Sequence, residues 1–445
     1  MTIMTERRTR PDAAAVLAGG TLLVVTALWV SNGGLQDLTG GGALSATGRL
    51  LGLWASNLLL IQVLLMARIP LVERAFGQDR LARWHRWTGF SSFWLMVAHI
   101  VLITLGYAAT ARTNPLQQLW QMIWNFPGML LAAAGFLALC MVVVTSIRAA
   151  RRRLRYESWH LLHLYAYLGA FLALPHQLWS GSDFVGSPWA TAYWWGLWGA
   201  AVAAVIAYRL IVPLLRNRRH RLVVDRVVPE ANGITSVYFN GNNLNKLPVR
   251  AGQFFHWRFL DGPGWTRANP FSLSAAPAGQ IRITVKDSGD GSARVATLKR
   301  GTRVLVEGPF GKLTGENYTG GPVVLLACGI GITPLLALLG ELPYGPGEAT
   351  LLYRVRDEAS TAFRHELDRF AAERGVRVVY LTGPRARSRS WLPAGRTDEL
   401  TALAPDIRAA RVFICGPEAW ATEAQAAVRA AGVPASRVHT ELFSW

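Results

Sequence analysis

Long apolar runs separated by short connectors dominate the first half of this 445-residue chain. Each run is close to the ~20 residues that an α-helix needs to cross the hydrocarbon core of a bilayer. Because every backbone polar group must be satisfied internally in lipid, such runs are expected to form a bundle of membrane helices. Six spans are expected, at residues 14–30, 50–67, 87–108, 129–147, 159–179 and 190–212.

Arginine predicts which way this bundle faces. Residues 1–220 hold 19 Arg and no Lys, and 17 of the 19 lie on one side of the expected bundle. Only Arg49 and Arg112 fall on the other side. Since positive loops mark the cytoplasm, both chain ends are expected there. The formal net charge of +19 therefore reflects topology, and no nucleic-acid partner is expected.

Histidines in spans three and five are the ionisable groups at membrane depth that indicate function. His85 and His99 are 14 residues apart in span three, so they point nearly the same way, about 21 Å apart along the helix. His163 and His176 are 13 residues apart in span five, and Pro175 is expected to kink or unwind the helix and turn His176 toward span three. The expected pairs are His85 with His163 and His99 with His176.

Facing imidazoles without a neighbouring Cys, Asp or Glu ligand suit an iron porphyrin held from both sides. Zinc fits less well, because its structural sites take four protein ligands. We therefore expect two bis-histidine b-type haems, one above the other. A single membrane histidine more often bonds a neighbouring helix, but two pairs of similar spacing fit that interpretation poorly. His160, three residues before His163, stays open as an alternative inner ligand.

A small antiparallel β-barrel is expected to follow the bundle, because short β-branched runs alternate there with turn residues. The expected strands are 222–228, 234–239, 254–260, 281–286 and 303–306. Residues 267–272 combine an arginine, an aromatic ring and a hydroxyl, and residues 285–292 place a lysine before a glycine-rich turn. Such groups bind a diphosphate or a flavin ring, although each stretch alone is equally typical of an ordinary barrel turn.

After residue 321, strands and helices alternate, which is typical of a parallel, doubly wound α/β sheet that binds ligands at the carboxyl ends of its strands. Strands are expected at 323–327, 350–355, 376–381 and 411–415. The first ends in a Gly-x-Gly loop, where Thr333 before Pro334 is expected to cap a helix and create an anion site. A lone Gly-x-Gly is also compatible with a tight turn.

Taken in order, the paired histidines, the NPFS and KDSGDGS stretches, the GIGITP loop, the CGP turn and a terminal aromatic resemble the NADPH oxidase and ferric reductase family, prokaryotic type. The resemblance covers nearly the whole chain. It implies a six-helix transmembrane haem domain at 1–216, an FAD-binding antiparallel β-barrel at 217–318 and an NAD(P)-binding doubly wound α/β domain at 319–445. It also implies a bacterial plasma membrane as the location.

The resemblance assigns site residues motif by motif. His85, His99, His163 and His176 correspond to the ligands of the haem irons. The residues that it implies for FAD are Arg267, Asn269, Pro270, Phe271, Ser272, Lys286, Gly289 and Ser292. Those that it implies for the nucleotide are Gly329, Gly331, Thr333, Pro334, Gly416 and Pro417, with Cys415 on the nicotinamide side.

Two further expectations concern the chain end and the choice of nucleotide. Family members end with an aromatic ring stacked on the isoalloxazine, which implies Trp445, with Phe443 as the alternative. That ring must be displaced for nicotinamide to reach the flavin. Arg354 and Arg356 end the second nucleotide strand and favour NADPH over NADH, because arginine can bind a 2′-phosphate. Asp357 beside them is compatible with the opposite choice.

The expected function is transmembrane electron transfer from cytoplasmic NADPH or NADH through FAD and two b-type haems. Dioxygen giving superoxide is the expected acceptor on the outer face, and ferric or cupric ion is the alternative. Eukaryotic oxidases place a second histidine where this chain has Ile103, which weakens the oxygen-reducing assignment. An alternative of another class is a haem-free membrane transporter or sensor that binds a nucleotide. The sequence leaves the oligomeric state open.

Overall fold

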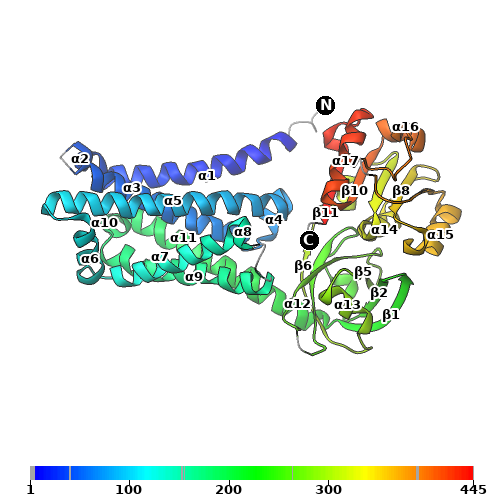
Figure 1. The fold of residues 1–445 in the computed structure, drawn as a ribbon, viewed down its shortest axis with the longest axis horizontal. Helices are drawn as coiled ribbons and strands as arrows, with labels where there is room; N and C mark the ends of the chain where they lie inside the picture. The colour runs from blue at the N-terminus through cyan, green and yellow to red at the C-terminus, as the bar shows by residue number, and fades with distance from the viewer. Residues whose placement is uncertain are drawn as a thin grey trace. The chain divides into compact units, whose positions relative to one another are not determined.

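Two compact units make up the chain. The computed structural model describes residues 6–39, 42–151, 154, 156–262, 264–386 and 390–443. The units are Met1–Ile211 and Val212–Trp445. Long helices build the first unit, and the second contains the strands of the described residues (Figure 1). The three-domain division expected at residues 216 and 318 stays a prediction.

The first unit consists of long helices joined by short ones. The long helices are α1 Glu6–Ser31, α3 Ala43–Met66, α5 Gln78–Ala111, α7 Met129–Ser146, α9 Tyr156–Trp179 and α11 Pro188–Val205, which continues into the π-helix η1 Ile206–Ile211. The helix α12 Val212–His220, which follows η1, is the first element of the second unit. The short helices are α2 Gly34–Thr39, α4 Pro70–Phe76, α6 Pro115–Asn125, α8 Arg148–Arg151 and α10 Ser182–Val185. Among the described residues, four segments are long and apolar enough to cross a membrane: Ala43–Met66, Arg80–Ala111, Met129–Ser146 and Pro188–His220.

Small and polar residues hold these helices together. Gly135 of α7 and Gly169 of α9 let the two helices touch, because a Cβ on either would lie 2.7 or 2.9 Å from the carbonyl oxygen of the other. Asn57 of α3 is fully buried, donates to the Thr21 hydroxyl of α1 at 3.0 Å and accepts from the Tyr193 hydroxyl of α11 at 2.6 Å. Such contacts stabilise helix pairs in lipid, where apolar burial between helices gains little.

Two antiparallel three-stranded sheets, in the orders β1-β2-β5 and β4-β3-β6, form the first part of the second unit. Their strands are β1 Val223–Ala231, β2 Ile234–Asn240, β3 Phe254–Phe259, β4 Asn269–Ser272, β5 Ile281–Lys286 and β6 Val304–Phe310, with the short helix α13 Asp290–Ala293 after β5. Isolated bridges from Val223 to Arg303 and from Leu273 to Ile283 connect the two sheets at both edges. An apolar core lies between the sheets.

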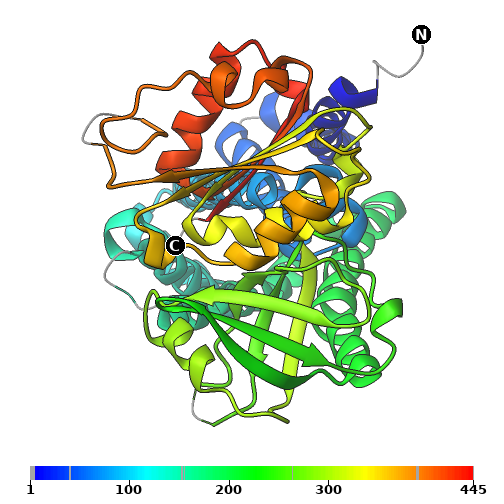
Figure 2. The same cartoon turned by 90° about the vertical axis from the view of Figure 1, so that its right-hand side faces the viewer.

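A five-stranded parallel sheet, in the order β11-β10-β7-β8-β9, forms the rest of the described second unit. Its strands are β7 Val323–Cys328, β8 Ala349–Val355, β9 Arg377–Thr382, β10 Arg411–Pro417 and β11 Val438–Phe443. Its helices are α14 Ile332–Glu341, α15 Arg364–Arg374, α16 Leu400–Leu403 and α17 Glu418–Ala430. α14 and α15 pack on one face of the sheet, and α16 and α17 pack on the other (Figure 2). Chain order reverses between β7 and β10, so ligands are expected at the carboxyl ends of these two strands.

Local structure differs from expectation at three places. The NPFS motif itself forms the edge strand β4, which its proline and lack of β-branched residues concealed. β11 is a fifth parallel strand that the pattern did not predict. Thr333 does not cap its helix: α14 begins at Ile332, directly after the turn Gly329–Gly331 (η5), and the buried Thr333 hydroxyl donates to the Ile330 carbonyl at 2.9 Å.

Candidate functional site

The four predicted membrane histidines lie in two facing pairs. The ring centroids of His85 on α5 and His163 on α9 are 5.9 Å apart, and those of His99 and His176 on the same two helices are 6.5 Å apart. Among the described residues, no group of three or more His, Cys, Asp or Glu side chains is placed to hold a metal ion. Each pair therefore offers two imidazoles on opposite sides of one position.

Backbone carbonyls of α3 hold the two histidines of α5. The Nδ1 atom of His85 lies 3.2 Å from the carbonyl oxygen of Gln62, and that of His99 lies 2.7 Å from the carbonyl oxygen of Gly48. A carbonyl oxygen only accepts hydrogen bonds, so each Nδ1 carries the ring proton. Each Nε2 then keeps a lone pair with which it can bind a metal.

The same contact pattern continues between these histidines. Ser92 stands seven residues after His85 and seven before His99, and its buried hydroxyl donates to the Ala55 carbonyl at 2.7 Å. The three carbonyl acceptors are likewise spaced by seven residues along α3. Side-chain to backbone hydrogen bonds thus join α3 and α5 at every second helical turn and hold both rings in one register.

Glycines make room for the outer pair. A Cβ on Gly52 of α3 would lie 2.5 Å from Nδ1 of His99. Gly128, which precedes α7 with a φ of +78°, lies so close to α9 that its Cβ would be 2.7 Å from the backbone nitrogen of His176. Sequence reasoning missed both positions, because a glycine in or beside an apolar run carries no mark of what lies against it.

The structure distinguishes His163 from His160. His163 turns its ring toward His85, and its Nδ1 lies 3.3 Å from the Ser146 hydroxyl at the end of α7. Trp159 packs against the same ring with centroids 5.0 Å apart. The side chain of His160 is exposed instead. The position facing His85 therefore belongs to His163.

Pro175 does not interrupt α9, which is helical from Tyr156 to Trp179. The unwinding expected at this proline is therefore not observed, although His176 faces His99 as the pairing predicts. Nδ1 of His176 is buried and has no hydrogen-bond partner among the described residues, whereas the other three Nδ1 atoms each have one. The two pairs thus differ in how firmly their rings are held.

The two flavin-motif stretches come together at β4. Asn269–Ser272 pair with β3, where the Trp257 indole nitrogen donates to the Phe271 carbonyl at 3.0 Å. The glycine-rich turn reaches the same strand, because a Cβ on Gly291 would lie 2.9 Å from Oδ1 of Asn269. Phe271 and Ser272 are buried, and Pro270 is exposed. The structure thus joins stretches that are separate in the sequence.

The glycine-rich turn closes on itself. The Ser292 hydroxyl accepts from the Ser288 backbone nitrogen and donates to the Gly289 carbonyl, both at 2.8 Å. Gly289 has a φ of +148°, which favours glycine. Lys286 at the end of β5 and Arg267 before β4 are exposed. The turn that follows Lys286 thus has a shape set by its own hydrogen bonds.

The nucleotide loop and the CGP turn meet at the carboxyl ends of β7 and β10. A Cβ on Gly331 would overlap the Cys415 backbone, lying 2.6 Å from its carbonyl carbon. A Cβ on Gly416 would lie 2.9 Å from the Cβ of Cys328. Gly329 has a φ of +54°. These glycines let the two loops touch at the point where the chain order of the sheet reverses.

The end of β11 lies beside these two loops. In the parallel pairing of β10 and β11, Pro417 is opposite Phe443 and Cys415 is opposite Glu441. Phe443 is partly buried and packs against the apolar core of the sheet. Trp445, the other predicted ring, lies outside the described residues. Glu441 is a functional candidate that sequence reasoning missed, because only strand pairing brings its carboxylate beside Cys415.

Arg354 is engaged inside the protein. Its side chain is buried, and its guanidinium donates to the carbonyls of Val355, Leu381 and Pro384, the last at 3.0 Å. It therefore holds the loop that follows β9, a role that its sequence position did not indicate. Arg356 is exposed and is the better placed of the two arginines for a 2′-phosphate.

Each half of the chain contains a segment that resembles known proteins. Residues 51–174 match the family described as ferric reductase like transmembrane component, and this segment contains His85, His99 and His163. The ferredoxin reductase component of 3-ketosteroid-9-alpha-monooxygenase from Mycolicibacterium smegmatis is 32% identical over 233 residues, which are 50% of this chain and 65% of that protein. The chain joins a ferric-reductase-like transmembrane domain to a ferredoxin-reductase-like module. The resemblance that the ordered motifs predicted is confirmed.

Other proteins resemble part of this ferric-reductase-like chain. A flavohemoprotein of Chromobacterium violaceum is 31% identical over 237 residues, covering 48% of this chain and 58% of the relative. The flavohem-like FAD/NAD binding domain of nitric oxide dioxygenase from Vibrio cholerae O1 biovar El Tor superposes with a TM-score of 0.42 and 23% identity, covering 51% of this chain and 99% of that one. The cytochrome P450 reductase GcoB of Amycolatopsis superposes with a TM-score of 0.43 and 24% identity, covering 50% of this chain and 69% of that one. The chain spans less than two thirds of the length of the two sequence relatives.

The two cysteines at the carboxyl ends of β7 and β10 are held in the neutral form. Burial raises the pKa of the Cys328 thiol to about 11, although Arg354, Lys286 and Arg385 oppose the shift. Burial also raises the pKa of the Cys415 thiol well above its ordinary value, and the charge of Glu441 adds to the shift. A thiol stays protonated below its pKa, so both are neutral at physiological pH.

This ferric-reductase-like protein should therefore show slow alkylation of Cys328 and Cys415. Because the thiolate is the reactive form, the alkylation rate of Cys328 is expected to rise about tenfold per pH unit up to about pH 11. The measurement is mass spectrometry of iodoacetamide-treated peptides between pH 7 and pH 10.5. The denatured chain is the control and should level off near its ordinary value of 9.0. A native rate that levels off near pH 9 would contradict the raised pKa.

Proposed function

We propose that this protein carries electrons from cytoplasmic NADPH or NADH, through FAD and two b-type haems, to an acceptor outside the membrane. The observation that carries the proposal is the two facing histidine pairs, three of whose members lie in the ferric-reductase-like segment. Ionisable side chains at membrane depth are costly and are kept for function. The six spans, the closed flavin barrel and a bacterial plasma membrane with cytoplasmic chain ends belong to the same proposal.

The geometry of the histidine pairs fits an iron held from both sides. An imidazole nitrogen lies about 2 Å from the metal that it binds, so two rings bound through Nε2 have centroids roughly 6 Å apart. The observed separations are 5.9 and 6.5 Å. A structural zinc ion fits poorly, because each pair supplies two nitrogens where zinc takes four ligands. The separations therefore support haem in both positions.

The chain contributes orientation at these positions. The Nδ1 protons of His85 and His99 bond α3 carbonyls, which leaves each Nε2 unprotonated and able to bind a metal. The Ser146 hydroxyl lies 3.3 Å from Nδ1 of His163 and holds that ring by a hydrogen bond. When bound, the flavin converts a two-electron hydride into single electrons, which the haem irons pass across the membrane.

The second unit supplies the groups for FAD and the nucleotide. The backbone N–H groups of the turn Gly329–Gly331 and the start of α14 are suited to a pyrophosphate. Lys286 brings a positive charge to the carboxyl ends of β7 and β8, because it acts electrostatically on Cys328 and on Asp357. The buried Ser272 hydroxyl is suited to a flavin ring nitrogen. The similarity to the ferredoxin reductase component of a monooxygenase supports an electron-transfer role for this unit.

Dioxygen is the outer acceptor that we propose, with superoxide as the product. Ferric or cupric ion is the second candidate, and the ferric-reductase-like family match favours it. Ile103, one helical turn beyond His99, packs against Gly48. That position therefore brings no second imidazole to the outer site.

A count of cofactors in the purified protein tests the electron path. Protein from cells supplied with a haem precursor should contain two haems and one FAD per chain. Reduced-minus-oxidised spectra should show the bands of six-coordinate low-spin haem after addition of NADPH. A colourless preparation, or one with metal elsewhere, would favour the haem-free transporter or sensor.

The acceptor is tested separately. Dye reduction that superoxide dismutase suppresses identifies dioxygen as the acceptor. Dye reduction that is insensitive to the dismutase, together with rapid reduction of a ferric chelate, identifies a metal reductase. Both assays use NADPH and the full chain in lipid.

A further inference from the structure

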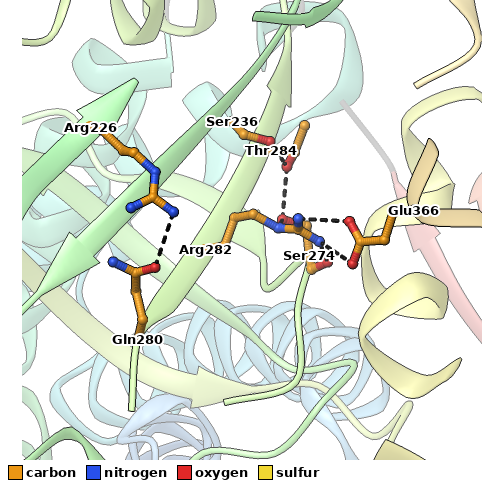
Figure 3. Close-up of polar contacts among 7 residues, drawn as sticks. All are labelled: Arg226, Ser236, Ser274, Gln280, Arg282, Thr284 and Glu366. Atoms are coloured by element: carbon orange, nitrogen blue, oxygen red, sulfur yellow. Dashed lines mark hydrogen bonds and ion pairs between the residues drawn. The ribbon is translucent and has the colours of Figure 1, made fainter. Parts of the chain in front are cut away.

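A buried polar cluster joins the flavin part of the second unit to its nucleotide part (Figure 3). Arg282 of β5 and Glu366 of α15 form its centre, and Ser274, Thr284 and Ser236 extend it into the flavin part. Arg282 is 7% exposed. None of these residues belongs to a cofactor motif, so the function described above leaves the cluster unexplained.

Arg282 holds Glu366 at two points. Its Nη1 donates to Oε2 of Glu366 at 2.8 Å, and its Nη2 is 3.2 Å from Oε1 (Figure 3). The ring of Phe363, which precedes α15, has its centroid 5.0 Å from the guanidinium carbon. A planar guanidinium that meets both carboxylate oxygens allows one orientation. The pair therefore fixes α15 relative to β5.

The same guanidinium holds the segment that follows β4. Its Nε donates to the Ser274 hydroxyl at 3.0 Å, and its Nη2 donates to the Ser274 carbonyl. Thr284 also donates to the Ser274 hydroxyl at 2.7 Å, and the Ser236 and Thr284 hydroxyls are 2.7 Å apart. Ser274 stands two residues after Ser272, the proposed contact of the flavin ring. Arg282 thus holds the segment that follows β4 at a point two residues from the proposed flavin contact, Ser272.

The strand β5 and the helix α15, which meet at this cluster, both stand close in the chain to residues of the proposed nucleotide site. Lys286, whose charge reaches Cys328, stands four residues after Arg282 on β5. On the other side, α15 follows β8, which ends beside the exposed Arg356. The ion pair therefore connects β5 of the flavin part with α15, the helix that follows β8 in the nucleotide part.

We propose that Arg282 is a positioning residue for hydride transfer, which sets the distance between the flavin and the nicotinamide by holding Ser274 and Glu366 together. This inference rests on the proposed function of the second unit. In that reaction the nicotinamide loses a hydride and the flavin gains it. A displacement of about 1 Å between reacting groups can cost on the order of 100-fold in rate. Loosening the pair should therefore slow the reaction without releasing either cofactor.

Removal of the pair should not separate the two parts. Ile234, Ala251 and Leu313 of the flavin part lie in the same apolar core as the nucleotide sheet. The Ala251 backbone nitrogen also donates to Glu341 of α14 at 3.0 Å. These contacts keep the flavin and nucleotide parts together when the Arg282–Glu366 pair is removed. Variants of the pair therefore report on the relative position of the two cofactors.

The test compares Arg282→Lys, Glu366→Gln and the double variant Arg282→Met/Glu366→Met in the full chain. The double variant leaves no unpaired buried charge, which guards against simple unfolding. Flavin reduction by saturating NADPH is followed in a stopped-flow instrument, and dithionite measures the total reducible flavin. We expect normal flavin content and a reduction rate about 10- to 100-fold lower. The KM for NADPH should change far less.

Asp398→Asn is the matched control, because the Arg396–Asp398 pair lies wholly within the nucleotide part. It should reduce flavin at the wild-type rate. Wild-type rates in all three variants of the Arg282–Glu366 pair would overturn the positioning role. If NADPH and NADH both fail to reduce the flavin of the wild-type protein, the proposed function itself is wrong. The two failures are therefore distinct.

Discussion

Replacement of His99 by Ala is expected to lower the haem content from two per chain to about one and to stop electron delivery to the outer face. The reason is that His99 supplies one of the two imidazoles that the described residues bring to the outer position, where its ring centroid lies 6.5 Å from that of His176. Without His99, a haem at this position would keep a single histidine to hold it. The measurements are haem per chain and the rate of reduction of an outer acceptor, which should fall on the order of 100-fold or more.

His160→Ala is the matched control for this variant. It also removes a histidine of the membrane unit, but the side chain is exposed and His163 occupies the position facing His85. Two haems should remain. Flavin reduction by NADPH should be unchanged in both variants, because the flavin and nucleotide residues lie in the other unit. Two retained haems in His99→Ala with full outer activity would contradict the proposed path.

Helical geometry explains why the histidine pairs were predictable. Fourteen residues return to nearly the same face of a helix, so His85 and His99 had to point the same way. The partner spacing of thirteen fits less well, and the prediction relied on Pro175 to correct it. The structure pairs His99 with His176 within a continuous helix, so no unwinding of α9 is needed. The spacing therefore predicted both pairs. The unwinding at Pro175 that was invoked for the His99–His176 pair was wrong.

What holds the histidines could not be predicted. The acceptors at Gln62 and Gly48 are backbone carbonyls, which every residue possesses, so no side chain marks them. Ser92 is the one polar clue, and its meaning depends on the register of α3 against α5. That register is a tertiary property. Sequence periodicity describes one helix at a time and says nothing of the neighbour.

In the second unit, too, the secondary structure could be predicted from the sequence but the side-chain contacts could not. Alternating strands and helices predicted the parallel sheet, and the motifs marked the strand ends where chain order reverses. The direction of a side chain was harder to predict. Arg354 is an arginine at a strand end, as expected of a phosphate ligand, yet its guanidinium bonds the carbonyls of Leu381 and Pro384. Likewise, Glu441 gained its place beside Cys415 only through the unpredicted strand β11.

Gly52→Val is expected to disable the outer position although it removes no ligand. A Cβ at residue 52 would lie 2.5 Å from Nδ1 and 2.8 Å from Cε1 of His99, and the ring is held against the Gly48 carbonyl at 2.7 Å. The ring must therefore leave its acceptor, which costs the tautomer and orientation that present Nε2. Loss of such support weakens metal affinity about 10- to 100-fold, so the outer haem should be under-occupied in the purified variant.

Gly199→Val on α11 is the control, because a Cβ there would meet nothing within 4 Å. Both variants add the same side chain to a long apolar helix, so a general effect on insertion or folding should appear in both. If Gly52→Val alone loses the outer haem and Gly199→Val keeps two, the room beside His99 is what the glycine provides. Equal haem content in the two variants would mean that the ring tolerates displacement, and the hydrogen bond from His99 to Gly48 would then not be required for binding.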